Sequence, residues 1–465
     1  MRGRYRSIFW SLILISVGLL FLLRNLGFEI RPWLIIAKYW PLLIIFWGLS
    51  KLLSYFRSEE DPNAARRSLL TGGDIVLLLF LLVLGSAVTK AVSFHLPDFP
   101  KDIFDLQSDE AFDVFDEAHK SFTYIEEKSQ PLTKKDGALE IQNQYGNVDI
   151  NVHSLPELKI RLEKKITTRN EAKAKELARL LKIKMEAKSP GYAVSTNRDQ
   201  MDAEQDEGIK TNLTIWVPKT TRVVVSNKYG SVTLNGVVGT HNLTNGYGAI
   251  KVSDIEGSLH IENQNGPITV TGVSGDCDIS NKYGAVELDT IGGKAHIDGG
   301  YGSVVLRKIK GPVQLVHKYG LVECNDLDST LSVDGRYAEI KGSNIGGDVQ
   351  ITTSYKDVDL ENVEGAMIIQ GKHGDINIKG EHSPSKPIKV ESEYSAVTIT
   401  LPEESRFRIE AYSKFGKFVS EFESIEGADF SPESVSGVKV KGSHGEGGPL
   451  ITVNTSYRDI NLNAS

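Results

Sequence analysis

Cysteine is nearly absent from this 465-residue chain, which contains only Cys277 and Cys324. Two thiols are too few for a disulfide-stapled scaffold or for a cysteine-rich zinc or iron–sulfur site. Gly-x-Ser-x-Gly, the phosphate-binding loop and His-Glu-x-x-His are missing as well, and no two histidines have the spacing of a zinc motif. We therefore expect a protein that is not an enzyme and has no cofactor, metal site or catalytic residues.

Long apolar runs are missing after residue 92, although they dominate the chain before it. The first 73 residues hold 10 Lys and Arg against 4 Asp and Glu, whereas the remainder holds 43 against 56, a formal balance of −13. The chain therefore joins two unlike parts. The acidic second part argues against nucleic acid as a partner.

Three apolar segments near the N-terminus approach the roughly 20 residues that a bilayer core requires. We predict a membrane domain over residues 1–91, with transmembrane helices over about 8–26, 33–53 and 73–91. The first helix lacks a small-residue cleavage site at its end, so we interpret it as a retained anchor and not as a signal peptide. If the third segment is instead a buried core helix, the large domain would be cytoplasmic.

Basic residues in the short loops predict the orientation, because Lys and Arg are enriched on the cytoplasmic side. The loop between the first two helices holds only Arg24 and Arg31. The opposite side holds Arg2, Arg4, Arg6, Lys51, Arg57, Arg66 and Arg67. We therefore expect a multi-pass protein of the cytoplasmic membrane, with a cytoplasmic N-terminus and an extracytoplasmic region over residues 92–465.

Residues 7–56 resemble a known membrane region. Ser11–Gly27 ends in LLRNLG, and Tyr39–Leu53 begins with an aromatic-Trp-Pro sequence. This pair is similar to the transmembrane helices of the LiaI/LiaF type, found in bacterial cell-envelope-stress proteins. The resemblance implies the lipid bilayer as a partner and a bacterial envelope setting. The third predicted helix is additional to such a hairpin.

An 18-residue repeat organises the second part of the chain. Tyrosines recur at intervals of 18 or 36 residues, with Asn265 in the one gap and His373 continuing the series. Glycine directly follows most of them, and apolar residues recur four positions before and three positions after each. The repeating tyrosines are Tyr229, Tyr247, Tyr283, Tyr301, Tyr319, Tyr337 and Tyr355.

Alternating apolar and polar residues are typical of β-strands, and glycine at a fixed phase suits tight corners. One unit cannot bury its apolar face, but nine in register can. We therefore predict an all-β parallel β-solenoid of 18-residue coils, each adding about 4.8 Å. Two glycine corners per coil favour a two-sided section over a three-sided one, and the crossover rule favours a right-handed coil.

The repeat frame also divides the chain. We expect a juxtamembrane linker over residues 92–131, and a first coil with a helix-bearing strand–helix–strand insertion over 132–222. The helix is expected at Asn170–Lys182. Regular repeats should follow over 223–383, and irregular C-terminal coils with a cap over 384–465. The insertion and the last coils would cover strand edges that otherwise invite aggregation.

Three stretches of this region carry a second resemblance. They are Leu213–Lys219, ending in VPK, then VVVSNKYGSVTLNGVVG from Val223, and GEGGPLITVNTSYRDINL from Gly445. They are similar to the bacterial putative-adhesin β-strand-repeat family over about residues 120–465. The resemblance implies an extracytoplasmic repeat domain of largely unassigned function.

The seven repeating tyrosines are the candidate binding residues, because one ring per coil would form a ladder along one edge. The ladder can be structural stacking at a corner, or it can be a glycan-binding stripe. Polar neighbours that would favour glycan binding are Asn227, Asn245, Asn263, Asn281, Lys228, Lys282, Lys318, Arg336 and Lys372.

Two other expectations follow from the repeat frame. Calcium-binding β-rolls also use 18-residue coils, but the turns here have no Asp at a fixed phase. Cys277 and Cys324 fall two coils apart, about 9.6 Å along the axis, beyond the roughly 7 Å limit for a disulfide. We therefore predict two reduced core thiols.

Together these patterns predict a non-catalytic, membrane-anchored cell-envelope protein whose β-solenoid senses or binds, with a role in the envelope-stress response. A multi-helix membrane end exceeds what tethering requires. The expected partners beyond the bilayer are a membrane signalling protein or cell-wall glycan. The alternative is a surface adhesin or glycan-binding protein.

Overall fold

The computed structural model describes residues 120–132, 137–168, 170–188, 191–201, 208–422, 425–431 and 437–465. The chain divides into two units, residues 1–117 and 118–465, and the described residues all belong to the second. The predicted membrane domain over residues 1–91 lies outside the described residues. Within the described part, no helix has the length and apolar character needed to cross a membrane.

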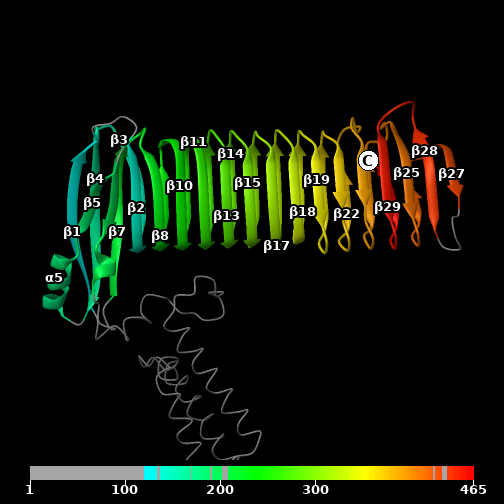
Figure 1. The fold of residues 1–465 in the computed structure, drawn as a ribbon. Coiled ribbons are helices and arrows are strands. Elements are labelled where there is room, and N and C mark those ends of the chain that lie inside the picture. The colour runs from blue at the N-terminus through cyan, green and yellow to red at the C-terminus, as the bar shows by residue number, and fades with distance from the viewer. Residues whose placement is uncertain are drawn as a thin grey trace, which may run out of the picture. The chain divides into compact units, whose positions relative to one another are not determined.

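A parallel β-solenoid with an 18-residue repeat makes up most of this unit (Figure 1). In one coil, β13 (Cys277–Tyr283) is followed by β14 (Val286–Ile291). These strands pair in parallel with β15 (Ala295–Tyr301) and β16 (Val304–Ile309) of the next coil. Each coil thus gives one strand to each of two sheets, sheet I with β13 and sheet II with β14. The predicted 18-residue β-solenoid is confirmed.

Sheet I combines strands that are far apart in the sequence. In spatial order, its N-terminal end contains β5 (Ile183–Lys188), β6 (Gly191–Thr196), β2 (Ala138–Tyr145), β8 (Arg222–Tyr229) and β10 (Val238–Tyr247). The regular coils follow with the second half of β11 (Ile250–Asn265), β13, β15, the first halves of β17 (Val313–Leu327) and β18 (Leu331–Ile345), β19 (Val349–Thr353), β21 (Met367–Gln370) and β23 (Ile388–Glu391). The C-terminal end contains β29 (Leu450–Thr455), β25 (Phe407–Ser413), β28 (Val438–His444) and β27 (Glu426–Ser431).

Sheet II lies opposite and begins with the N-terminal strand. It contains β1 (Lys120–Pro131), β4 (Glu157–Thr168), β7 (Gly208–Pro218), β3 (Val148–His153), β9 (Val232–Asn235), the first half of β11, β12 (Ile268–Val273), β14, β16, the second halves of β17 and β18, β20 (Val358–Val363), β22 (Ile376–Lys379), β24 (Val397–Leu401), β30 (Ile460–Ala464) and β26 (Phe418–Ser420). Because β1 is a strand of this sheet, the last twelve residues of the predicted 92–131 linker belong to the folded unit.

The core between the sheets is aliphatic. In the coil of Tyr283, Ile279 points inward from sheet I, and Leu288 and Ile291 point inward from sheet II, each at most 1% exposed. The step from 288 to 291 breaks the two-residue alternation because Thr290 has a φ of 59°. Such a left-handed residue bends the strand and returns the next apolar side chain to the core.

This bend recurs at the same position in eight consecutive coils. The residues are Gly236, Asp254, Gly272, Thr290, Lys308, Asp326, Asn344 and Asn362, all with positive φ. Six of the eight are Gly, Asp or Asn, the types that adopt this conformation at least cost. The sequence therefore carries a signal for the bend, seven residues after each tyrosine position.

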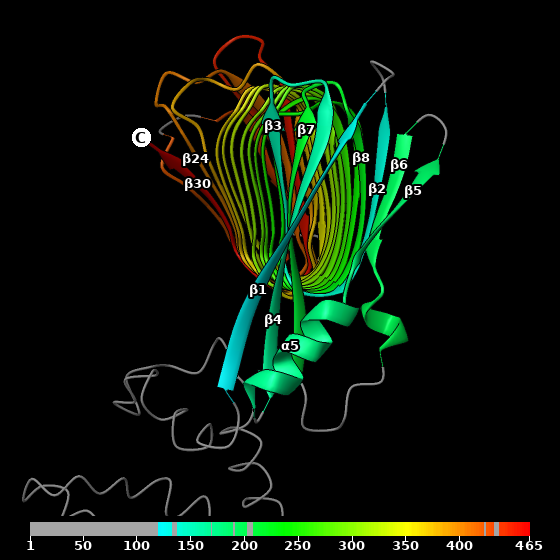
Figure 2. The same ribbon diagram turned by 90° about the vertical axis from the view of Figure 1, so that its left-hand side faces the viewer.

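The N-terminal end is covered by the insertion (Figure 2). β4 pairs antiparallel with β1 and β7, and helix α5 (Glu171–Leu180) packs against β4 and β1. The helix lies within the predicted Asn170–Lys182. Its N-terminus is capped by Asn170, whose side chain accepts a hydrogen bond from the Lys173 amide at 2.8 Å. The buried face of the helix and the strands form a small separate core of Ile166, Ala174, Leu177, Ala178, Leu181 and Ile209.

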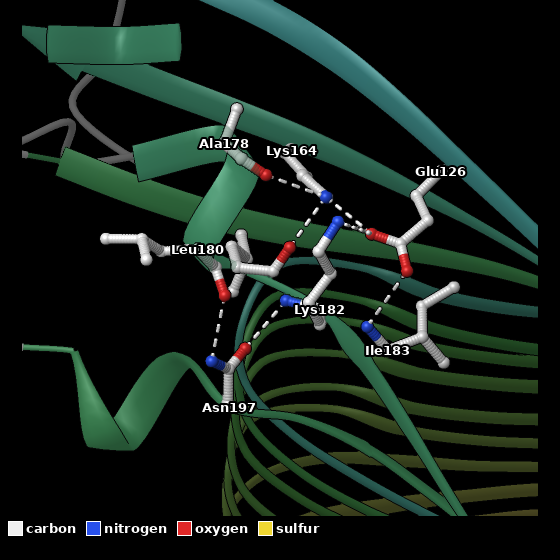
Figure 3. A network of polar contacts seen from close by, with 8 residues as sticks. Glu126, Lys164, Ala178, Leu180, Lys182, Ile183 and Asn197 are labelled. Atoms are coloured by element: carbon white, nitrogen blue, oxygen red, sulfur yellow. Dashed lines mark hydrogen bonds and ion pairs between the residues drawn. The ribbon is translucent and has the colours of Figure 1, made fainter. Parts of the chain in front are cut away.

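A buried lysine closes the other end of α5 (Figure 3). Lys164 Nζ donates to the carbonyls of Ala178 and Leu181 at 2.9 and 2.6 Å, and contacts Glu126 Oε2 at 2.5 Å. Burial alone would raise the pKa of Glu126, but the hydrogen bond from Lys164 and the positive charges of Lys164 and Lys182 lower it. The network satisfies carbonyls that a helix end leaves open, so its role is structural.

The C-terminal end reverses the order of the chain. β29 and β30 pair with β23 and β24, while β25 and β26, which come earlier in the sequence, lie on their far side. β28 and β27 then extend sheet I with antiparallel pairing. The coil at the end of the stack is therefore that of Phe415 and not that of Tyr457.

Candidate functional site

Aromatic rings stack along one corner of the solenoid in two runs. Tyr145, Tyr229 and Tyr247 form the first, with centroids 5.0 and 5.1 Å apart. In the second run neighbouring centroids are 4.5 to 5.2 Å apart and interplanar angles reach at most 21°. It comprises Tyr283, Tyr301, Tyr319, Tyr337, Tyr355, His373, Tyr394, Tyr457 and Phe415. We call the two runs the aromatic ladder.

The ladder follows from parallel pairing in register. Tyr301 lies opposite Tyr319 in the paired strands, so their rings meet without any offset along the strand. The chain turns at the next residue, Gly302, which has a φ of 132°. A Cβ there would lie 2.5 Å from the Gly284 carbonyl oxygen. A side chain does not fit at residue 302. Tyr337 and Tyr355 stack in the ladder without a following glycine, so the paired strands and not the glycine set the ring position.

The ladder is accessible to solvent. Of the seven tyrosines predicted as a binding ladder, five are 40–48% exposed and two, Tyr229 and Tyr337, are partly buried. Lys228 and Lys282 place their Nζ atoms 5.4 and 5.5 Å from the centroids of the tyrosine rings that follow them. At the two ends, Arg198 of the 3₁₀ helix Arg198–Gln200 approaches Tyr145, and Lys414 approaches Phe415. Desolvation and the neighbouring rings of Tyr355 and Tyr319 raise the pKa of Tyr337.

The asparagines next to the tyrosines do not belong to this surface, so their proposed part in glycan binding is wrong. Asn143, Asn227, Asn245, Asn263 and Asn281 point into the core and are at most 5% exposed. Asn245 Nδ2 donates to the Gly230 and Gly248 carbonyls at 3.1 Å, and Asn227 Nδ2 donates to Asn245 Oδ1. These five residues form an inner amide ladder that satisfies corner carbonyls.

Two histidines also lie in the core. His317 takes an asparagine position of the inner amide ladder, and its Nε2 lies 2.9 Å from the Gly302 carbonyl oxygen. A side chain on Gly299, one coil away, would collide with the His317 ring at 2.4 Å. Burial lowers the pKa of His317. His241 is fully buried, accepts a hydrogen bond from the Val223 amide at Nδ1, and has a pKa lowered by burial to about 4.

The cysteines are buried and free, as predicted. Cys277 lies in sheet I and Cys324 in the sheet II half of β17. Burial raises the pKa of each thiol to about 12, which makes both unreactive at neutral pH. Among the residues that the structure describes, no three His, Cys, Asp or Glu side chains are grouped to hold a metal ion.

Sheet II has a shallow groove of about 470 Å³ on its outer face. Lys341, Asp359, Glu361 and Lys379 are among its lining residues. Lys379 pairs with Glu361 at 2.8 Å and Lys341 pairs with Glu339 at 2.9 Å. The sequence repeat gave no signal for this groove, because the outward positions of the strands are not periodic.

Comparisons with known proteins agree with the resemblances at both ends of the chain. A family described as the LiaI-LiaF-like transmembrane region matches residues 8–52, which indicates membrane anchoring. The family described as Toastrack DUF4097 matches residues 137–463. No curated protein matches the chain.

Two solved structures are similar to parts of this chain. One is a putative cell adhesion protein from Clostridium sporogenes, 11% identical, with a TM-score of 0.17 and coverage of 74% of this chain and 100% of that one. The other is a putative adhesin from Bacteroides fragilis, 10% identical, with a TM-score of 0.17 and coverage of 74% and 97%. At these TM-scores neither likeness carries a conclusion about this chain.

Proposed function

The chain belongs to the Toastrack DUF4097 family, and from this membership we propose that it is a non-catalytic cell-envelope protein whose membrane-anchored solenoid senses or binds. The observation that carries the proposal is the aromatic ladder, a row of half-exposed rings on a rigid scaffold. Repeat proteins use such extended surfaces for binding. In the sheet II groove, Lys341 and Lys379 are each paired with a glutamate, so these charges do not form a reactive cluster.

The proposed topology has three transmembrane helices over about 8–26, 33–53 and 73–91, a cytoplasmic N-terminus and an extracytoplasmic, right-handed solenoid. Its support is the LiaI-LiaF-like match and the distribution of basic residues. Cysteine probes at Glu446 and Asn63 in intact cells test it, because the native thiols are buried. We expect an impermeant reagent to label position 446 and not position 63, and the reverse result contradicts the topology.

We propose regulation of the envelope-stress response as the biological role, with a membrane signalling protein as partner. The membrane end is larger than an anchor requires, and its match to the LiaI-LiaF-like region supports this role. Deletion of the gene should change the expression of envelope-stress genes under cell-wall antibiotics. The membrane segments alone should co-purify with the partner. An unchanged stress transcriptome contradicts this role.

The second candidate function is adhesion through glycan binding, which the exposure of the aromatic ladder favours. Tyrosine rings offer an apolar face and a polar hydroxyl, both of which a sugar can contact. In this case the full chain should bind isolated cell-wall glycan. Replacing Tyr283, Tyr301 and Tyr319 by alanine should abolish binding while the β-sheet circular dichroism is retained. If this variant binds glycan as well as wild type does, the aromatic ladder is not the binding site.

A further inference from the structure

The aromatic ladder has one empty level, between Tyr247 and Tyr283. Strand pairing places Tyr247 opposite Asn265, and Asn265 opposite Tyr283. The two tyrosines are therefore two coil steps apart, about 9.6 Å. Each is held at its own level by a ring on its other side, since Tyr229 stacks on Tyr247 at 5.1 Å and Tyr301 stacks on Tyr283 at 5.2 Å.

The empty level has the height of one ring. A ring midway between Tyr247 and Tyr283 would lie about 5 Å from each, within the range of favourable ring contacts. Neighbouring rings elsewhere in the ladder are separated by 4.5 to 5.2 Å. The Asn265 side chain is much shorter than a tyrosine, so the outer part of its level is open. Tyr247 is 46% exposed and Tyr283 is 44% exposed.

Two amides lie at this level, whereas two other levels have a lysine beside the ring. Lys228 and Lys282, one position before their tyrosines, reach the rings of their own levels at 5.4 and 5.5 Å. Gln264 holds that position beside Asn265 and is exposed, so a second neutral amide can reach the open space. In the preceding coil, Gly246 holds this position beside Tyr247, so no side chain covers the slot from there.

Two aromatic faces with amides between them suit a pyranose ring. The C–H faces of the sugar pack on tyrosine rings, while an amide donates to one hydroxyl and accepts from another. A purely apolar ring would cover the Asn265 amide without offering it a hydrogen-bond partner. We propose that the slot formed by Tyr247, Asn265 and Tyr283 binds one pyranose ring of an envelope glycan. The inference rests on the proposed glycan-binding function and names its site.

The test is to fill the slot. Asn265→Tyr supplies the missing ring and should stack on Tyr247 and Tyr283, so it blocks the site without disturbing the fold. The full chain is purified in a detergent without a sugar headgroup, and binding of chitotetraose, cellotetraose and maltotetraose is measured by titration calorimetry and saturation-transfer NMR. We expect at least one of the three to bind, and its affinity to fall at least tenfold in Asn265→Tyr with an unchanged or higher melting temperature.

Two further variants make the result specific. Thr271→Tyr also adds a tyrosine to the coil of Asn265, but at an exposed position of β12 in sheet II, away from the ladder, and should leave the affinity unchanged. Asn265→Ala keeps the slot open and removes the amide, so it should weaken binding less than Asn265→Tyr.

Each contrary outcome has a distinct meaning. If an oligosaccharide binds wild type and Asn265→Tyr equally well, glycan binding stands and the slot is wrong. If none of the three binds wild type, both the slot and glycan binding are wrong. If a tyrosine-rich peptide binds wild type and loses affinity in Asn265→Tyr while the sugars do not bind, the occupant is an aromatic side chain and the pyranose assignment is wrong.

Discussion

The aromatic ladder and the inner amide ladder lie two residues apart in the sequence of each coil that they share, yet they respond differently to irregularity. The outer ladder contains a histidine at residue 373 and lacks a ring at Asn265. Where the inner ladder departs from asparagine, neighbours change with it: the His317 ring occupies the space beside Gly299. The exposed corner tolerates omission because water replaces the missing contacts, whereas at the buried corner the side chains supply the donors for corner carbonyls.

The largest effect is expected at Gly302, the corner residue that follows Tyr301 of the aromatic ladder. Gly302→Ala places a Cβ 2.5 Å from the Gly284 carbonyl at a φ of 132°. Strain and displacement of the neighbouring coil should lower the free energy of unfolding by about 3 kcal/mol or more. Denaturant titration followed by circular dichroism measures it. Gly447→Ala is the control, because it also has positive φ but no atom lies within 4 Å of its Cβ. Equal losses in the two variants would show that backbone strain, and not the contact between coils, dominates.

The second-largest effect is expected on acidification, which should lower the free energy of unfolding through the buried His241. His241 accepts the Val223 amide proton in its neutral form, and its pKa is lowered from 6.5 to about 4 by burial and by the charge of Arg222. Because the folded pKa is below the unfolded one, the unfolded state binds more protons between pH 6.5 and 4. Stability should therefore be fully present above pH 6.5 and fall as the pH drops toward 4, by about 2–3 kcal/mol for this group.

The measurement is the pH dependence of the unfolding free energy for wild type and His241→Leu. Leucine stands at the equivalent position one coil later, at Leu259, so the side chain fits the core. The variant loses the bond to Val223, but its stability should change less between pH 7 and pH 4. Parallel pH profiles for the two proteins would show that His241 is protonated in the folded state without cost.

Removing one residue from each ladder compares them directly. Asn245→Ala takes away hydrogen bonds to two corner carbonyls and to Asn227, and should cost about 1–3 kcal/mol. Tyr319→Ala takes away two ring contacts from a residue that is 40% exposed, and should cost less, about 1 kcal/mol. Thr244→Ala, an exposed position of the same strand as Asn245, is the control. A larger loss for Tyr319→Ala than for Asn245→Ala would reverse the comparison.

The repeat could be predicted from the sequence because both of its signals are local. Apolar residues at fixed phases, such as Ile279 and Val286, mark the core strands, and Gly302 marks a corner. The inward direction of Asn227 could not be predicted in this way, because a polar residue in an alternating pattern is normally an outward one. Its burial is favourable because Nδ2 bonds to the Gly230 carbonyl of its own coil and to Asn245 of the next, contacts that the alternating pattern does not show.

The order of the last coils could not be predicted from the sequence either, for a different reason. Phe415 and Gly416 occupy the Tyr and Gly positions of a coil, but the two coils here are 42 residues apart and the later one inserts before the earlier. Sequence spacing gives the content of a coil and not its place in the stack. The positive-φ bend, by contrast, was visible in the sequence as Gly, Asp and Asn at one phase and could have been predicted.

The smallest effect is expected when a ring is added at Asn265, the empty level of the aromatic ladder. Asn265→Tyr adds ring contacts to both Tyr247 and Tyr283 and buries no polar group, because the Asn265 side chain is only partly buried. The gain should be about 0.5–1.5 kcal/mol, the usual value of an aromatic pair, since part of the added ring stays in water. Thermal unfolding of the full chain measures it, with Asn265→Leu as a control that adds apolar volume without a ring. If Asn265→Tyr destabilises the protein, the two runs of rings are not aligned across the gap, and the outer ladder is as intolerant of change as the inner one.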